Sequence, residues 1–140
     1  MEEKVFSSLN QEKKVLEGFV SGIKKRERVF LVAEHKDKII GTSTVHLKRG
    51  REDHIGELGI TIAEGYRGIG LGRCLFEDVI DLATKKLKPK PRIIALMVYE
   101  NNKPAIALYE KCGFKKVSQI PDAVQWKEAL ISECRMYKYL

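Results

Sequence analysis

Cysteine is scarce in this sequence of 140 residues, and the three thiols at Cys74, Cys112 and Cys134 form no CxxC or Cys/His cluster. That spacing argues against a disulfide framework or a metal site and favours reduced thiols in the cytoplasm. No run of about 18 apolar residues is present, so no membrane-spanning helix is expected. The opening residues, MEEKVFSSLN, also lack the basic-then-apolar order of a signal peptide.

Long linkers, repeats and low-complexity segments are absent as well, which predicts a single domain over residues 1–140. The net charge is +7, yet no basic block is longer than Lys24-Lys25-Arg26 and acidic residues are interleaved throughout. This pattern favours a solvated charged surface over a nucleic-acid-binding stripe, so no nucleic-acid partner is expected. A basic balance still favours anionic ligands such as a phosphate-bearing small molecule.

Hydrophobic periodicity predicts an α+β fold, with a mixed, mostly antiparallel sheet and helices on both faces. Residues 92–99 are almost continuously apolar, which predicts a strand buried on both faces and paired in parallel. A polar connection containing Pro121 and Trp126 is expected between the last two strands. The predicted helices cover residues 12–25 and 71–87 and a segment between Asn102 and Gly113, and the predicted strands cover residues 28–34, 39–48, 54–63, 92–99, 114–120 and 131–139.

Three glycines in five positions, Gly68, Gly70 and Gly72, directly precede the apolar run of the second predicted helix. A glycine-rich turn at a helix N-terminus exposes backbone N–H groups and the positive end of the helix dipole, which suits a phosphate. A Walker loop would need GK[ST], but Gly72 is followed by Arg73 and Cys74. A dinucleotide fingerprint would need a third glycine where Leu75 stands.

A third phosphate loop, R-x-x-G-x-G, is met by Arg67-Gly68-Ile69-Gly70-Leu71-Gly72. Downstream, VYENNKPAIALYEKCGF meets the pattern V-x-x-x-N-x-x-A-x-x-x-Y-x-x-x-G-F from Val98 to Phe114. With both motifs in order, the sequence resembles the GNAT superfamily of acetyl-CoA-dependent N-acetyltransferases from about Arg28 to the C-terminus. The resemblance implies the family's fold, acetyl-CoA as co-substrate, and transfer of acetyl to a primary amine.

The resemblance also implies residues that hold the co-substrate. The family's pyrophosphate lies on loop amides, with arginines able to add charge-assisted contacts. Its pantetheine arm pairs with the strand before the loop, where an amide near Ile62 would polarise the thioester carbonyl. The matching positions here are Ile60, Thr61, Ile62, Arg67, Gly68, Ile69, Gly70, Leu71, Gly72 and Arg73, together with Asn102 and Tyr109.

Two of these residues have a structural alternative. Asn102 matches the family asparagine that hydrogen-bonds the pantetheine arm, and it is equally suited to cap a helix. Tyr109 matches the family's general acid, which protonates the departing thiolate. Because Ile106, Leu108 and Cys112 lie close in sequence, Tyr109 is also a candidate core residue.

A carboxylate is the expected base for the acceptor amine. Glu57, ten residues before Arg67, stands where many family members carry such a glutamate, and its alternative is an exposed strand carboxylate. Glu100 is the second candidate, and water alone is the third. Met97 stands where ribosomal-protein acetyltransferases of the family often carry a glutamate, which argues against that subclass.

Family members usually have a strand and two helices before the strand expected at Arg28, but only 27 residues precede it. The N-terminal elements are therefore expected to be shortened, which leaves a sheet edge for a second copy to cover in a homodimer. The favoured acceptor is a small amine, amino acid or polyamine. A protein or peptide acetyltransferase and a non-catalytic CoA-binding regulatory module are the alternatives.

Overall fold

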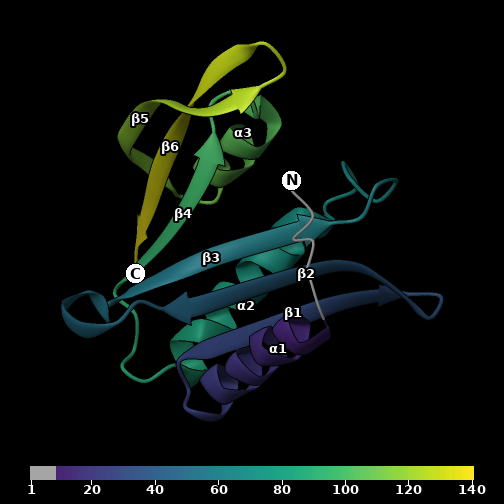
Figure 1. Ribbon diagram of the computed structural model, residues 1–140, viewed down its shortest axis with the longest axis vertical. Helices are drawn as coiled ribbons and strands as arrows, with labels where there is room; N and C mark the ends of the chain where they lie inside the picture. The colour runs from purple at the N-terminus through teal and green to yellow at the C-terminus, as the bar shows by residue number, and fades with distance from the viewer. Residues whose placement is uncertain (1–8) are drawn as a thin grey trace.

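The computed structural model describes residues 9–140, with side chains from Glu17 onward, as a six-stranded sheet with three α-helices (Figure 1). Among those residues, no helix is long and apolar enough to cross a membrane. In chain order the elements are α1 (Leu9–Lys24), β1 (Arg28–His35), β2 (Lys38–Leu47), a 3₁₀ turn (Gly50–Glu52), β3 (Ile55–Ile62), α2 (Leu71–Lys86), β4 (Ile93–Tyr99), α3 (Lys103–Lys111), β5 (Lys115–Trp126) and β6 (Ala129–Tyr139).

The strand order is β1-β2-β3-β4-β6-β5, and only the β3–β4 pair is parallel. A parallel pair needs a crossover connection, and here the glycine-rich loop and α2 supply it. The strands β1, β2 and β3 form an antiparallel meander, and the predicted mixed, mostly antiparallel sheet is confirmed. Within the described part of the chain, α1 is the one helix before β1, and β1 forms an edge of the sheet.

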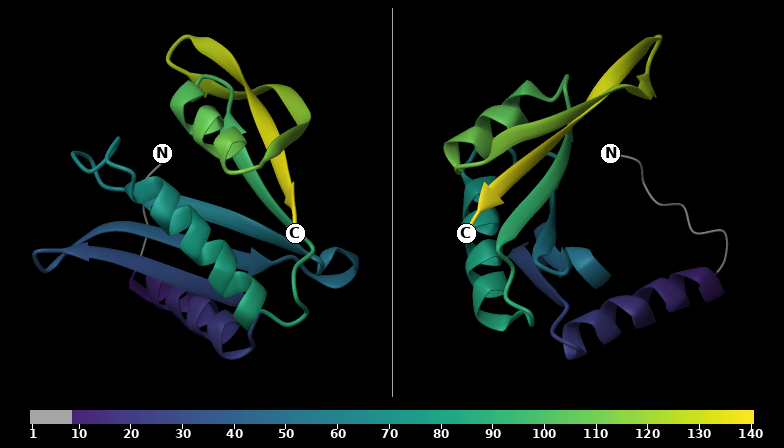
Figure 2. Two further views of the ribbon diagram at one scale, coloured as in Figure 1. Left: turned by 180° about the vertical axis from the view of Figure 1, so that it is seen from behind. Right: turned by 90° about the vertical axis from the view of Figure 1, so that its left-hand side faces the viewer.

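Helices cover both faces of the sheet, as predicted. Figure 2 shows α2 and α3 on one face and α1 on the other. On the α1 face the Phe19 and Phe30 rings meet edge-on, with centroids 5.0 Å apart. The main core lies on the α2 face, where alternate residues of the strands meet the apolar side of α2. Its largest fully buried side chains are Phe76, Phe114, Leu87, Ile94 and Met136.

The last two strands differ from the sequence prediction. The expected polar connection holding Pro121 and Trp126 is wrong, because β5 continues to Trp126 and pairs there with Ala129. A register irregularity between Ile120 and Val124 takes up the proline, which has no N–H to donate. Since β5 is an edge strand, this break in the ladder is tolerated.

The prediction for β4 holds only for its first half. Ile94, Ala95 and Leu96 are buried, but Met97 is 47% and Tyr99 39% exposed. The strand is therefore not buried on both faces throughout. Val98, on the same face as Ile94 and Leu96, stays buried, so the exposed residues of the second half lie on the opposite face of the sheet.

Candidate active site

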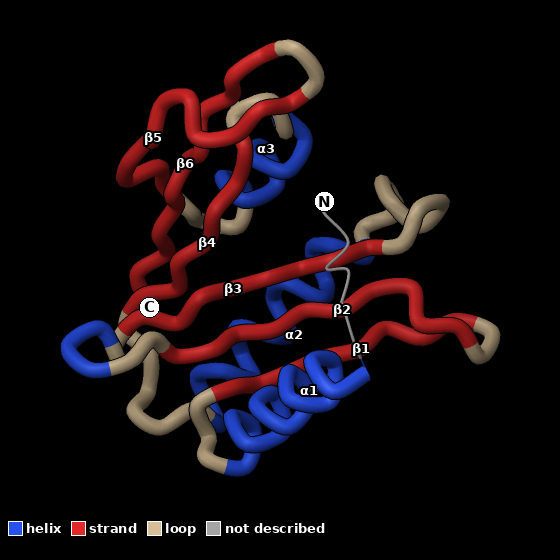
Figure 3. The backbone as a smooth tube through the Cα atoms, in the orientation of Figure 1, coloured by secondary structure: helices blue, strands red, loops and turns tan. Residues whose placement is uncertain are grey.

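Strands β3 and β4 separate like the arms of a V. Their parallel register runs from the pair of Ile55 with Ile93 to the pair of Glu57 with Ala95, and it ends there. Beyond that point β3 runs on to the glycine-rich loop while β4 turns away beside β6 (Figure 3). The segment Ile60, Thr61 and Ile62, expected to accompany a pantetheine arm, lies in the diverged part of β3.

A cavity of about 650 Å³ opens at this divergence. Its volume lies in the range of roughly 300–1,000 Å³ that is usual for small-molecule sites. Both predicted catalytic residues, Glu57 and Tyr109, line it, although they come from different elements. The other lining residues are Arg28, Thr44, His46, Leu58, Gly59, Ile60, Ala95, Leu96, Met97, Tyr99, Asn101, Val124, Gln125, Trp126, Ile131 and Arg135.

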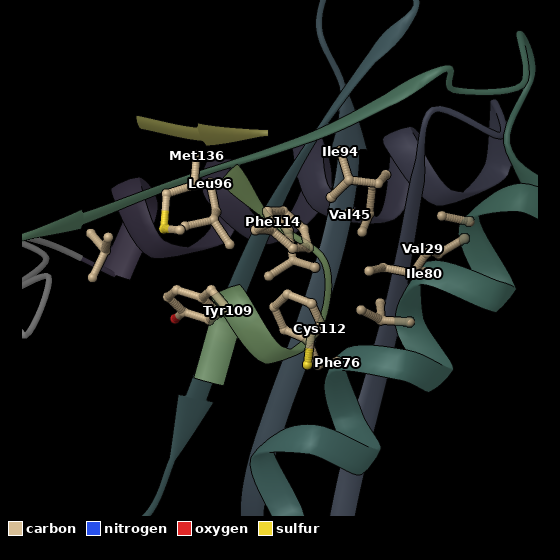
Figure 4. Close-up of a cluster of buried hydrophobic side chains, with 14 of the residues drawn as sticks. Val29, Val45, Phe76, Ile80, Ile94, Leu96, Tyr109, Cys112, Phe114 and Met136 are labelled. Atoms are coloured by element: carbon tan, nitrogen blue, oxygen red, sulfur yellow. The ribbon is translucent and has the colours of Figure 1, made fainter. Parts of the chain in front are cut away.

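Tyr109 belongs to the core and to the cavity at once. The residue is 9% exposed, and its ring stacks on Phe76 with centroids 5.4 Å apart. Figure 4 shows the hydroxyl oxygen directed away from Phe76 and Phe114. Burial raises the pKa of Tyr109, because the phenolate would lose its solvation. The phenol therefore stays protonated at neutral pH, as a proton donor must.

Glu57 lies in a cluster of cationic and imidazole groups. One carboxylate oxygen, Oε2, is 3.3 Å from His46 Nε2, and the other, Oε1, is 3.4 Å from Arg135 Nη1 and 3.6 Å from Lys48 Nζ. Its side chain is 33% exposed, so water and a ligand can reach it. The second candidate base, Glu100, does not line the cavity and instead accepts a hydrogen bond from Gln119 Nε2 at 3.1 Å.

Three polar residues of the cavity, Arg28, His46 and Arg135, have no place in the sequence motifs. His46 could have been found from the alternation of β2, because antiparallel pairing with β3 sets it opposite Glu57. Burial lowers the pKa of His46, and the nearby Arg28 charge lowers it further, whereas Glu57 raises it. Arg135 gave no signal, because the sequence does not reveal that β6 lies beside β4.

The glycine-rich loop has a backbone conformation that residues with a side chain rarely adopt. Gly68 and Gly70 have φ of 76° and 84°, and a Cβ at either position would meet no atom within 4 Å. Their backbone is thus open to a ligand at the N-terminus of α2, where no side chain caps the helix and no acidic residue lies in the first turn. An anion fits such a site. Gly72 differs, because its Cβ would lie 3.0 Å from Ile62 Cδ1, so this glycine allows α2 to pack closely on β3.

The remaining predicted co-substrate residues lie in this loop, in the first turn of α2 and at the start of α3. Arg67 and Ile69 are exposed, and Leu71 is half-buried. Arg73 is exposed and its Nε donates to Glu77 Oε1 at 2.8 Å, so a phosphate there would share it with a carboxylate. Asn102 caps α3, with Oδ1 accepting from the Ala105 backbone N–H at 3.4 Å. The cap prediction for Asn102 is therefore confirmed.

Comparisons with known proteins agree with this geometry. Over 110 residues the chain is 29% identical to an N-alpha-acetyltransferase of Sulfurisphaera tokodaii, covering 71% of this chain and 64% of the relative. It is also 29% identical over 86 residues to the L-amino acid N-acetyltransferase AaaT of Escherichia coli, covering 61% of this chain and 52% of the relative. The matched segments thus span less than two thirds of either relative's length.

A solved structure extends the likeness to the whole fold. The crystal structure of a GNAT-family acetyltransferase from Streptococcus pneumoniae matches with a TM-score of 0.81 and 27% identity, covering 97% of this chain and 78% of that one. The family model of the Acetyltransferase (GNAT) family matches residues 2–114. The match includes the glycine-rich loop, the diverging strands and Tyr109, and the chain belongs to the GNAT acetyltransferase family.

Proposed function

We propose that this protein transfers acetyl from acetyl-CoA to the primary amine of a small acceptor within a ternary complex. The observation that carries the proposal is that Glu57 and Tyr109 line one cavity at the divergence of β3 and β4. The names of the relatives, one an N-alpha-acetyltransferase and one an L-amino acid N-acetyltransferase, support an amine acceptor. Acetyl-CoA supplies the acetyl group as a thioester whose sulfur leaves as a thiol.

The loop and the diverged strand hold the co-substrate in this proposal. Backbone N–H groups at positions 68–73 bind the pyrophosphate, with Arg67 and Arg73 adding charge. Residues 60–62 of β3 lie along the pantetheine arm, and an amide near Ile62 polarises the thioester carbonyl. Asn102 hydrogen-bonds the arm while it caps α3, since the side chain carries an amide N–H₂ besides the capping oxygen.

Proton transfer is assigned to two residues on either side of the reacting bond. Glu57 accepts the proton that the acceptor ammonium loses, directly or through one water. The amine nitrogen then bonds to the acetyl carbon as the carbon–sulfur bond breaks. Tyr109 donates its phenolic proton to the departing sulfur, and the second proton that the new amide nitrogen loses passes through water to restore the phenol. Its raised pKa keeps that proton available through the neutral range.

The test is thiol release from acetyl-CoA with a panel of amino acids, polyamines, aminosugars and short peptides. Acceptor-dependent thiol release with at least one amine is expected. Tight CoA binding without any release would favour the regulatory module instead. Preference for short peptides over all small amines would favour a peptide acetyltransferase.

A homodimer is proposed as the form in solution, because β1 is an edge strand of the described sheet. Phe30 and Val32 on this strand are 38% and 46% exposed, which a partner subunit would reduce. Sedimentation at tens of micromolar checks this, and a monomer alone would contradict it.

A further inference from the structure

Three polar side chains form a row across the sheet, one from each of three adjacent strands. The register pairs Arg28 of β1 with His46 of β2, and His46 with Glu57 of β3. All three line the cavity. Neighbouring strands lie about 4.8 Å apart, so the backbone of Arg28 is roughly 10 Å from that of Glu57. The row therefore reaches from the proposed base to a cation at the edge of the sheet.

Arg28 is held in place by contacts with uncharged groups. Its guanidinium carbon lies 4.4 Å from the centroid of the Phe19 ring, a cation–π contact with α1. The side chain also passes close to Gly22, where an added Cβ would lie 3.3 Å from Arg28 Cβ. Burial lowers the pKa of Arg28, which reflects the removal of the guanidinium from water. These contacts orient Arg28 but do not neutralise it.

No carboxylate among the described side chains forms an ion pair with Arg28, in contrast to the neighbouring cations. Arg135 is paired with Glu57 and Glu133, and Lys48 is paired with Glu52 and Glu57. A half-buried guanidinium whose five donors meet no carboxylate of the described residues is suited to bind an anion, because its planar fork matches a carboxylate. The missing anion is thus a candidate part of the ligand.

The charge of the cavity points the same way. Its lining contains two arginines, Arg28 and Arg135, but one carboxylate, Glu57. The lining therefore carries more positive than negative charge, and a proton on His46 would add to it. A cavity of this sign attracts ligands with an anionic group and repels a polyamine, which carries only positive charges.

We infer that the acceptor is an amino carboxylic acid, whose carboxylate binds Arg28 while its amine faces Glu57. The placement of the amine at Glu57 rests on the proposed function. The binding of the carboxylate to Arg28 narrows the class of acceptor. The row of Arg28, His46 and Glu57 thus positions both ends of the acceptor, the carboxylate at Arg28 and the amine at Glu57. Amines without a carboxylate leave Arg28 without its anion and are therefore poor acceptors.

The first experiment measures binding without catalysis. Trp126 is the sole tryptophan and lines the cavity, so its fluorescence reports on ligands there. With CoA present, the protein is titrated with L-alanine, L-phenylalanine, β-alanine and γ-aminobutyrate, and with ethylamine, phenethylamine and propylamine. At least one amino acid is expected to bind roughly 10- to 100-fold more tightly than its amine, the usual range for a charged hydrogen-bonded contact.

Variants connect that preference to Arg28. Arg28→Gln should abolish the preference, Arg28→Lys should restore part of it through its point charge, and the exposed Lys25→Gln should leave it unchanged. Thermal unfolding shows that each variant is folded. The inference is overturned if no amino acid binds, if amines bind equally well, or if Arg28→Gln and Lys25→Gln behave alike.

The second experiment measures thiol release with the same pairs. Arg28→Gln should lower kcat/KM for the amino acid by about 10-fold or more, with little change for the matched amine. Arg28-dependent binding without any thiol release would contradict the acetyl transfer and retain the carboxylate site. Equal turnover of amino acids and amines by the wild type would retain the transfer and overturn the carboxylate site.

Discussion

Tyr109 is the residue whose two environments matter most to the proposed chemistry. Its ring packs on Phe76 and Phe114 in the core, and its side chain also lines the cavity. Removing the hydroxyl leaves the packing in place and deletes only the proton donor. The alternative of a core residue and the alternative of a general acid are thus compatible in the structure, and one substitution separates them.

For Tyr109→Phe we expect kcat to fall by more than about 10-fold with little change in acetyl-CoA affinity, because the lost interaction belongs to the transition state. Steady-state kinetics and calorimetric titration measure the two quantities. Thermal unfolding should be almost unchanged. Turnover near the wild-type rate would remove Tyr109 from the mechanism.

Glu57 is the second residue whose substitution is informative. Glu57→Gln keeps the size of the side chain but cannot accept the amine proton, so kcat/KM should fall by at least about 10-fold and the acidic limb of the pH–rate profile should disappear. Glu100→Gln is the matched control, since Glu100 lies outside the cavity lining, and it should keep the wild-type profile. An acidic limb that survives in Glu57→Gln would exclude Glu57 as the base.

His46 lines the cavity, and its protonation also affects the stability of the fold. Its pKa is lowered in the folded state, so below about pH 6.5, the unperturbed value, the unfolded chain binds the proton more readily. The contribution of His46 is therefore lost as the pH falls from about 6.5 towards the folded-state pKa. In His46→Gln, the free energy of unfolding in urea should decline less between pH 7.5 and pH 5.5 than in the wild type. An equal decline in both proteins would contradict this.

At the scale of elements, the order and type of the helices and strands could be predicted from periodicity. The residues of the site could be predicted only in part. The loop motif and the Asn102–Tyr109 pattern are local in sequence, so the co-substrate residues could be proposed without coordinates. The extension of β5 through Pro121 could not be predicted from the sequence, because a register irregularity depends on the partner strand. Arg28 and Arg135 were missed for a similar reason, since cross-strand neighbours follow from register and strand order.

The loop before α2 is the element whose backbone conformation carries a prediction. Alanine at Gly70 must adopt a φ of 84°, at a cost of about 1–2 kcal/mol in stability, and any shift of the loop amides should weaken CoA binding by roughly 10-fold. Gly50→Ala is a matched control, because Gly50 has a φ of 64° and open space around it, in the turn before β3. It should share the stability loss and keep CoA affinity. Equal affinity in both variants would contradict the loop's assignment.

At the scale of the molecule, the sheet itself creates the site by letting one pair of strands diverge. The parallel pairing of β3 and β4 fixes Glu57 beside Ala95. The cavity lies beyond this pair, where the two strands diverge, and residues of β5 and β6 also line it. α2 and α3 pack on one face and bring Tyr109 to that cavity. Donor and acceptor are thereby expected to occupy one site together.

The most direct measurement of this central claim is the initial velocity of thiol release with acetyl-CoA and acceptor varied together. Direct transfer within a ternary complex predicts double-reciprocal lines that intersect, with no thiol burst in the absence of acceptor. Parallel lines with a stoichiometric burst of thiol from acetyl-CoA alone would show a covalent acetyl-enzyme and contradict the account.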